Sequence, residues 1–247
     1  MTQIDLSGKT ALVTGAAGGL GAAIAAGLHA NGATVALLDR DARANTATAA
    51  ALGDRATPVH ADLADLDQLR TAFAEATERL DGVDILVNNA AVAPMRTLWD
   101  IEPEEWDTVF AINVRAAFFL SRMAAEGMRA RGCGRIINIA SLAGQKARPT
   151  GAHYGASKAA LTAMTRVFAA ELAADGVTAN AVAPGMIDTP LVHSIGEEKE
   201  AELTAEIPVG RIAEPNEIAD LVSFLAADTG AFINGATYDI NGGVLMR

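Results

Sequence analysis

The sequence predicts a doubly wound α/β fold, in which helices cover both faces of a seven-stranded parallel sheet. Short apolar runs rich in Val, Ile and Thr alternate with long alanine- and leucine-rich stretches along the whole chain. Continuous apolar runs are typical of strands that are buried on both faces, as a parallel sheet requires. No linker, low-complexity tract or internal repeat interrupts the alternation, so we expect one domain over residues 1–247.

Each expected strand is a short apolar or β-branched segment that ends in a polar or glycine-containing turn. The seven expected strands are Thr10–Thr14, Thr34–Asp39, Thr57–His60, Ile85–Asn88, Arg135–Ala140, Thr178–Ala183 and Thr237–Ile240. Between them lie amphipathic stretches that are typical of crossover helices. The main expected helices are Leu20–Ala30, Leu66–Leu80, Trp106–Ala130, Ala156–Ala173 and Asn216–Ala226.

A charged segment at about 188–207 follows the sixth expected strand. It contains the run Gly-Glu-Glu-Lys-Glu-Ala-Glu-Leu, which is typical of a solvated surface helix. It also begins where a strand ends, and ligands bind at the carboxyl ends of strands in such sheets. We therefore favour a substrate lid, with the solvated helix as the alternative. The apolar residues that would close the lid are Leu191, Val192, Ile195, Leu203 and Ile207.

Composition argues against several classes of function. Hydrophobic residues make up 51 % of the chain, but no uninterrupted apolar run approaches the roughly 18 residues that cross a membrane. The first residues lack the pattern of a secretory signal. A net charge of −11 disfavours nucleic-acid binding, which needs a basic stripe. The single cysteine, Cys133, forbids an internal disulfide and fits a reducing compartment, so we expect a cytoplasmic protein. His29, His60 and His193 show no metal-ligand spacing, so no metal site is predicted.

The first expected strand leads into the glycine-rich run Thr14-Gly15-Ala16-Ala17-Gly18-Gly19-Leu20-Gly21, and a helix follows. Gly15, Gly19 and Gly21 would let the backbone turn tightly and approach a pyrophosphate, whose charge a helix N-terminus stabilises. The run departs from G-x-G-x-x-G, because Ile24 occupies the third glycine position. A glycine cluster between a strand and a helix nevertheless predicts a Rossmann-type dinucleotide site.

Asp39 ends the second expected strand, about 20 residues beyond Gly19, where a carboxylate accepts hydrogen bonds from the adenosine ribose. A carboxylate there repels a 2′-phosphate, so NAD is favoured over NADP. Two alternatives stay open: Asp39 could cap the next turn, and neighbouring Arg40 could bind a 2′-phosphate. Asp62 could bind the adenine amino group, and Asn88-Asn89-Ala90 could fix a turn beside the cofactor.

Tyr154 and Lys158 occupy positions i and i+4 of the run Tyr-Gly-Ala-Ser-Lys, so in a helix they share a face. A neighbouring ammonium favours the phenolate, so we expect the pKa of Tyr154 to lie below its ordinary value of about 10. A phenol that exchanges protons near neutrality suits carbonyl–alcohol redox chemistry. Ser141 would add a hydrogen bond to the same substrate oxygen. Each residue alone is better explained as an ordinary structural residue, and only the context of the glycine turn and Asp39 favours a site.

Together these residues resemble the short-chain dehydrogenase/reductase family, in its compact branch. The resemblance covers the whole chain, from the glycine-rich run to Asn241-Gly242-Gly243. The family's motifs occur in its order: Asp62, Asn88-Asn89-Ala90, Asn113, Ser141, Tyr154-x-x-x-Lys158 and Pro184-Gly185-Met186-Ile187-Asp188-Thr189. One departure is Ala91, where the family has a glycine, and the added methyl matters if the backbone φ there is positive.

The resemblance implies a catalytic tetrad. Tyr154 would be the acid/base, Ser141 would orient the substrate oxygen, and Lys158 would lower the pKa of the tyrosine and hold the nicotinamide ribose. Asn113 would hold a water that relays protons to Lys158, although alone it reads as a helix kink or a hydrogen-bonded core amide. The implied cofactor contacts are Gly15, Gly19, Leu20, Gly21, Asp39, Asp62, Leu63, Asn89, Ala90, Tyr154, Lys158, Pro184, Gly185, Ile187 and Thr189.

The expected function is therefore an NAD-dependent oxidoreductase that interconverts a secondary alcohol and a ketone. One alternative is an NADPH-dependent 3-oxoacyl-carrier-protein reductase, and another is a non-catalytic dinucleotide-binding sensor. The family resemblance also implies a homotetramer, with the helices around Asn113 and Tyr154 between subunits. Substrate contacts are expected from Ser141, Gln145, His153, Tyr154 and Met186, near the further pocket candidates Val92, Met95, Leu142 and Leu191. His153 could instead be an exposed residue at a helix start.

Overall fold

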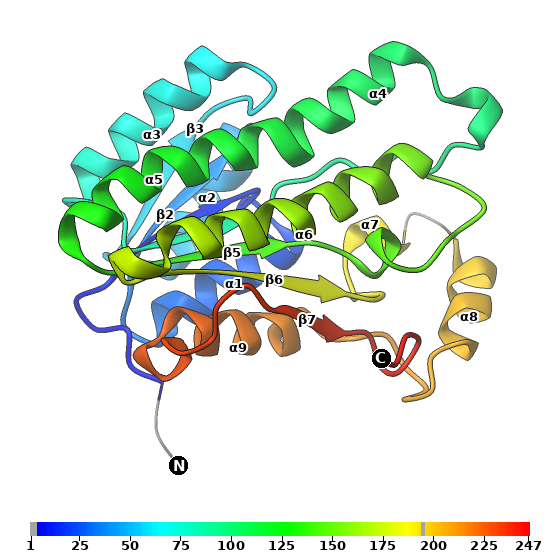
Figure 1. The fold of residues 1–247 in the computed structure, drawn as a ribbon. Helices are drawn as coiled ribbons and strands as arrows, with labels where there is room; N and C mark the ends of the chain where they lie inside the picture. Colours follow the sequence, from blue (N-terminus) through cyan, green and yellow to red (C-terminus); the bar gives the residue numbers. More distant parts are fainter. Residues whose placement is uncertain (1–3, 194–195) are drawn as a thin grey trace.

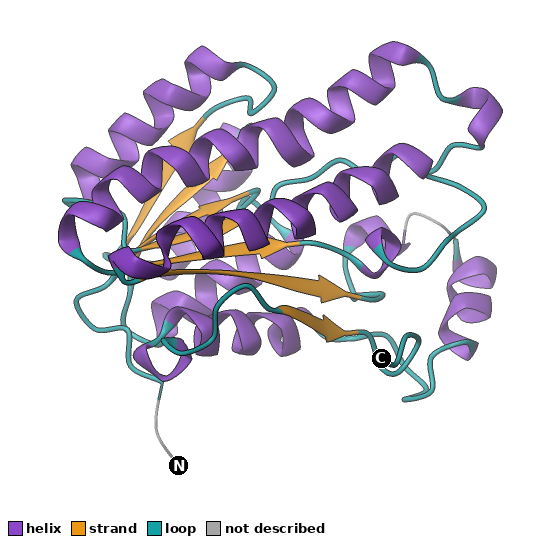
Figure 2. Cartoon of the chain, viewed as in Figure 1, coloured by secondary structure: helices purple, strands orange, loops and turns teal. Residues whose placement is uncertain are grey.

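The computed structural model describes residues 4–193 and 196–247. Its strands form one seven-stranded sheet in the order β3-β2-β1-β4-β5-β6-β7, and every neighbouring pair is parallel (Figure 2). The strands are β1 Thr10–Thr14, β2 Thr34–Asp39, β3 Ala56–His60, β4 Ile85–Asn88, β5 Gly134–Ile139, β6 Val177–Pro184 and β7 Thr237–Ile240. The chain changes direction across the sheet between β1 and β4, and such a switch point is where open α/β sheets bind ligands.

Helices cover both faces of the sheet, as the sequence predicts (Figure 1). One face packs against α1 (Gly19–Ala30), α2 (Ala42–Leu52) and α9 (Pro215–Ala226). The other packs against α3 (Leu66–Leu80), α5 (Ala117–Arg131) and α6 (Ala152–Leu172). The remaining helices are α4 Pro103–Phe110, the π-helix η2 Ala111–Ala116, α7 Pro190–His193 and α8 Glu197–Ala205, with short 3₁₀ turns at η1 Leu98–Asp100, η3 Leu142–Gly144, η4 Ala173–Asp175 and η5 Asp228–Gly230.

Side chains of each strand alternate between the two helical layers. In β1, Val13 packs with the α1–α9 layer, and Leu12 packs with the α3–α5 layer. Both are fully buried, because helices cover the two faces of the parallel sheet. This explains why the strands appear in the sequence as continuous apolar runs.

The predicted fold class is confirmed. The bounds of β1, β2, β4 and β7 are those expected from the sequence, β3 differs by one residue at its start, and β5 and β6 differ by one residue at each end. The helix Leu66–Leu80 has its predicted bounds, with Asp65 accepting hydrogen bonds from the Asp67 and Gln68 amides at its start. The predicted helix Trp106–Ala130 is instead a composite of α4, η2 and α5.

That composite stretch, Pro103–Arg131, is long and apolar enough to cross a membrane when length and composition alone are considered. Core helices of soluble proteins pass the same test, and 44 % of its most apolar window is buried inside this fold. Leu120, Ala124 and Met128 of α5 belong to the core between this helix and the sheet. The stretch is accordingly weak support for a membrane span.

A buried polar network links the sheet to α5 and α6. The Asn88 amide on β4 donates to Ser121 Oγ of α5 (2.9 Å) and to Asn138 Oδ1 of β5 (2.8 Å). The Asn138 amide in turn donates to Thr165 Oγ1 of α6 (2.8 Å). All four side chains are buried. The network fixes the position of α6, which carries Tyr154 and Lys158, against the central strands.

Replacing Asn138 with Ala should destabilise the fold, because the Asn88 amide and the Thr165 hydroxyl each lose a buried partner. We expect a loss of about 1–3 kcal/mol in the free energy of unfolding, measured by denaturant titration. The control is Asn216→Ala on the exposed side of α9, which should change stability by no more than about 0.5 kcal/mol. Equal stabilities of the two variants would contradict the role of the network.

Candidate active site

The glycine turn between β1 and α1 forms a tight backbone cradle. Gly15 has φ +66°, and a Cβ at this position would lie 2.8 Å from Ala90 Cα. A Cβ on Gly21 would lie 2.0 Å from the Gly15 carbonyl oxygen. The Asn89 amide holds the turn by donating to the carbonyls of Thr14 (2.9 Å) and Gly15 (3.2 Å). Only glycine fits at these two positions, which explains the pattern seen in the sequence.

The start of α1 is free of its own side-chain caps. Gly18 occupies the N-cap position without a side-chain hydrogen bond, and the first turn contains no acidic residue. The first amide groups of Gly19 and Leu20 are therefore available for an anion, which the helix dipole also favours. This combination of backbone cradle and uncapped helix start fits a dinucleotide pyrophosphate.

A cavity of about 120 Å³ lies beside this turn, at the switch point of the sheet. Its lining includes many residues predicted to contact the cofactor: Gly15, Asp39, Asp62, Leu63 and Ala90. Asp39 Oδ2 accepts a hydrogen bond from the Ala17 amide (3.0 Å), and Oδ1 accepts one from the Asp41 amide (2.9 Å). A carboxylate has about four acceptor positions, so Asp39 keeps capacity for ribose hydroxyls. Arg40 lines the same cavity and is exposed.

Ala91, where the family pattern has glycine, also lines this cavity. Asp81 is the only non-glycine residue with a positive φ among residues 4–193 and 196–247. The backbone at Ala91 is therefore in a region that alanine readily adopts, and its methyl group introduces no backbone strain.

Tyr154 and Lys158 lie on the first turns of α6, on the same face of the helix. The helix starts just after Gly151, whose φ of +72° turns the chain from the preceding loop. Lys158 is almost completely buried, and its Nζ donates to the carbonyl of Ile139 at the end of β5 (2.7 Å). That Nζ also lies 5.8 Å from the centre of the Tyr154 ring. The predicted pairing of phenol and ammonium is present.

The protonation of this pair differs from the expectation. Burial raises the pKa of Tyr154, and this outweighs the opposing effects of a Ser141 hydrogen bond and the charge of Arg148. Burial also lowers the pKa of Lys158 to about 8. The prediction of a lowered pKa for Tyr154 is therefore wrong for the structure without a cofactor, because desolvation disfavours the phenolate.

Ser141 and Asn113 approach the pair from two other elements. Ser141 caps η3, where its Oγ accepts a hydrogen bond from the Ala143 amide (3.1 Å). Asn113 lies in the π-helix η2, a widened turn of a kind that is frequent at functional sites. Its amide donates to the Val92 carbonyl (3.0 Å) and Ser157 Oγ (3.0 Å), and its Oδ1 accepts from the Val92 amide (2.9 Å). The side chain of Asn113 thus holds the loop after β4 against α6.

The segment after β6 carries the residues expected on the nicotinamide side. Gly185 approaches Asn241 so closely that a Cβ would lie 3.1 Å from its Cα. Ile187 forms a parallel backbone bridge with Ala213. This bridge fixes the position of the segment that follows Pro184 and Met186. The Thr189 methyl lies 3.7 Å from the place where a Gly19 Cβ would be. The segment after β6 therefore lies beside the glycine turn.

The structure changes the position expected for one substrate contact, His153, and for one further pocket candidate, Leu142. His153 is fully buried, its Nε2 lies 3.2 Å from Glu105 Oε1, and its ring stacks on Trp106 of α4. It is therefore neither a substrate contact nor an exposed helix start, and its assignment to the pocket is corrected. Leu142 is also a buried core residue.

Gln145 lies close to Tyr154, in the wall of a cavity of about 320 Å³ that also includes Met95. Its amide donates to Asp239 Oδ1 of β7 (2.8 Å). Three further residues at the site were not singled out from the sequence. Thr14 Oγ1 accepts from the amides of Asn89 and Ala90, Ser157 accepts from Asn113, and Arg148 lines the cavity of Tyr154. Ser157 could have been found, because it lies inside the Tyr154–Lys158 run.

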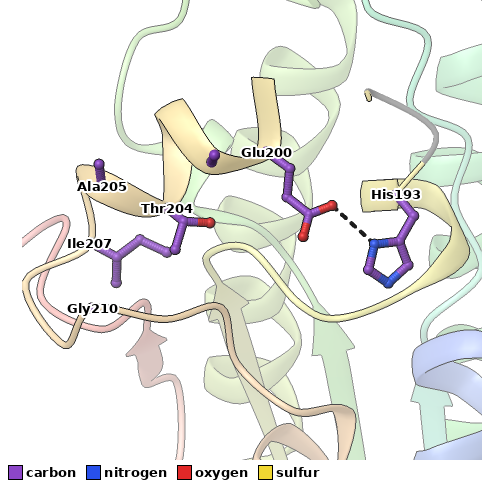
Figure 3. A pocket seen from close by; sticks show the side chains of 7 residues that line it. His193, Glu200, Thr204, Ala205, Ile207 and Gly210 are labelled. Atoms are coloured by element: carbon purple, nitrogen blue, oxygen red, sulfur yellow. Dashed lines mark hydrogen bonds and ion pairs between the residues drawn. The ribbon is translucent and has the colours of Figure 1, made fainter. Parts of the chain in front are cut away.

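The segment expected to form a lid folds into α7 and α8 at the carboxyl ends of β6 and β7 (Figure 1). Figure 3 shows His193 of α7 facing Glu200 of α8, with its Nδ1 3.0 Å from Oε2. Its Nε2 lies 2.6 Å from Asp188 Oδ1, and both carboxylates raise the pKa of His193. A cavity of about 590 Å³ opens beside this link, next to Thr204, Ile207 and Gly210. Ile195 and the side chain of Leu191 lie outside the described residues, Val192 and Leu203 are half-buried, and Ile207 is buried.

Comparison with known proteins places these features in a family. A family model described as enoyl-(acyl carrier protein) reductase matches residues 15–245. Nodulation protein G of Rhizobium sp. (strain N33) is 38 % identical, over 99 % of this chain and 100 % of that protein. The 3-oxoacyl-[acyl-carrier-protein] reductase FabG of Rickettsia bellii (strain RML369-C) is 39 % identical over the same shares. A solved structure named as a short chain dehydrogenase/reductase family protein is 41 % identical, with a TM-score of 0.88 over 96 % of this chain and 97 % of that one.

The fold, the glycine cradle and the order of the motifs agree with these similarities. This chain therefore belongs to the short-chain dehydrogenase/reductase family, whose members are oxidoreductases that use a nicotinamide dinucleotide.

Proposed function

We propose that this protein catalyses the NAD(H)-dependent interconversion of a secondary alcohol and a ketone, with Tyr154 as the acid/base. The observation that carries the proposal is that Tyr154, Ser141 and Lys158 lie together at the carboxyl ends of the strands. The glycine cradle lies at the same end of the sheet. A bound nicotinamide would supply the hydride acceptor or donor. The protein's part is to orient the substrate oxygen and to move its proton.

In the oxidative direction, the carbinol oxygen would give its proton to the phenolate form of Tyr154 while the carbinol carbon gives up a hydride, which the nicotinamide would accept. Ser141 would hold that oxygen by hydrogen bonding, and it lies near enough to Tyr154 to lower the pKa of the phenol. The Lys158 ammonium, fixed by the Ile139 carbonyl, would stabilise the phenolate, which accepts the proton in oxidation and forms again in reduction. Since Val92 and Ser157 engage the Asn113 amide, we assign Asn113 to holding the widened turn of η2. The water that would relay protons to Lys158 would then bind to the backbone of that turn.

NAD is the proposed cofactor because Asp39 places a carboxylate in the wall of the cavity next to the glycine turn. A 2′-phosphate there would meet a like charge at short range, which is unfavourable. The alternative is an NADPH-dependent 3-oxoacyl-carrier-protein reductase. It is supported by the name of the Rickettsia relative and by Arg40, which lines the same cavity.

We also propose that α7 and α8 form a lid over the site and that the protein assembles as a homotetramer. The His193 link ties α7 to α8 beside the cavity there, which supports a lid that moves as one unit. Phe118 on α5 and Val167 on α6 are exposed apolar side chains on neighbouring helices. Exposed apolar groups on one surface are typical of protein contacts, which supports an interface there between subunits.

Replacing Tyr154 with Phe should lower kcat by about 100-fold or more, because the acid/base is lost and the ring remains. Binding of NADH, followed by its fluorescence, should stay within a few-fold of the wild type. Tyr238→Phe removes the chain's only other tyrosine and should leave turnover nearly unchanged. Wild-type turnover in the Tyr154→Phe protein would defeat the proposed role.

The wild type should also prefer NAD(H) to NADP(H) in kcat/KM. Asp39→Asn should raise the relative use of NADP(H) by about 10-fold, because the like charge next to a 2′-phosphate is removed. Asp41→Asn, at the exposed start of α2, is the control and should leave the preference unchanged. A wild type that prefers NADP(H) would instead favour the 3-oxoacyl reductase alternative.

A further inference from the structure

The loop between Ser141 and Tyr154 has an unusual charge for this protein. The chain as a whole carries 30 acidic and 19 basic Lys and Arg residues. The loop contains Lys146 and Arg148 and no acidic residue. Both cationic side chains are exposed. An acidic protein repels anions over most of its surface, so a local positive loop changes which molecules can approach the site.

Lys146 and Arg148 lie in the wall of the same cavity as Tyr154. This cavity has a volume of about 320 Å³, and Gln145 and Gly151 also line it. That volume is at the lower end of the range for small-molecule sites, about 300–1,000 Å³. Any substrate that places its oxygen at Tyr154 would therefore lie close to the two cations.

Among the described residues, neither cation has an acidic partner within hydrogen-bond distance. No ion pair involves Arg148 within residues 4–193 and 196–247, and Lys146 Nζ lies 4.0 Å from the exposed Glu206 carboxylate. Other arginines of this protein pair closely: Arg129 Nε lies 2.6 Å from Asp175, and Arg211 contacts Glu217 through two bonds. The guanidinium of Arg148 thus keeps its planar set of donors available for a carboxylate, which it can bind through two parallel hydrogen bonds.

We propose that Arg148, assisted by Lys146, binds the carboxylate of the substrate, so that the alcohol oxidised at Tyr154 is a small hydroxy acid. This inference rests on the proposed function and narrows its substrate class. Arg148 also lies near enough to Tyr154 for its charge to favour the phenolate. The carboxylate would consequently lie only a few bonds from the carbinol carbon, which favours a free acid over the distant acidic surface of a carrier protein.

The test compares acids with uncharged analogues of the same shape. The substrates are 3-hydroxybutyrate, 2-hydroxybutyrate and gluconate, each beside its methyl ester or amide, together with 2-butanol and cyclohexanol. The proteins are the wild type, Arg148→Ala, Arg148→Lys and the control Arg79→Ala. Arg79 is an exposed arginine on α3 that pairs with Glu75, so its removal changes net charge equally without altering the cavity.

We expect the wild type to oxidise at least one acid with a kcat/KM about 10-fold or more above that of its uncharged analogue. Arg148→Ala should lower kcat/KM for that acid by about 10–100-fold, mainly through KM, and change the uncharged analogue by less than about 3-fold. Arg148→Lys should recover part of the loss, and Arg79→Ala should match the wild type.

Equal use of acids and uncharged analogues by the wild type would overturn the inference, as would an equal loss for both in Arg148→Ala. Oxidation of 2-butanol or cyclohexanol without any of the acids would also overturn it, while the proposed function would stand. If the wild type oxidises neither class with NAD or NADP, the proposed function fails and the inference fails with it.

Discussion

The contact between the Lys158 ammonium and the Ile139 carbonyl is the interaction on which the site depends. It joins the first turns of α6 to the end of β5, and so it sets where the Tyr154 phenol lies relative to the sheet. Burying an ammonium is costly, which is why the pKa of Lys158 falls to about 8. The buried network from Asn88 through Asn138 to Thr165 also holds α6 against β5. Burial of Lys158 thus lowers the free energy of unfolding, and it places a positive charge near Tyr154.

The cofactor half depends on a second constraint, the close approach of backbone to backbone. Gly15 meets Ala90, and Gly21 meets the Gly15 carbonyl, at distances that exclude any side chain. Asn89, just after β4, donates a hydrogen bond to the turn, and Asp39, at the end of β2, accepts one from it. Since Thr189 approaches Gly19 from the segment after β6, the cradle lies close to the start of the proposed lid.

The sequence predicted most of the fold, because buried parallel strands leave apolar runs that are hard to misread. It could not distinguish the π-helix around Asn113 from an ordinary helix, since both have the same apolar spacing. The assignment of His153 failed because sequence order beside Tyr154 does not reveal that its ring packs under α4. The direction of the Tyr154 pKa failed for a related reason: Lys158 is visible in the sequence, and the degree of burial is not. Arg148 was missed because a loop residue has no periodicity to mark its position.

The most direct test of this account is an ultraviolet titration of the Tyr154 phenol in the Tyr238→Phe protein, where it is the only tyrosine. Without a cofactor, the phenolate band should appear only above the ordinary pKa of about 10, because burial disfavours the charge. With NAD present, the positive charge that the bound nicotinamide would bring to this site should lower that pKa clearly. A phenol that titrates below its ordinary value without NAD, or identically with and without it, would contradict Tyr154 as a buried acid/base that faces the cofactor.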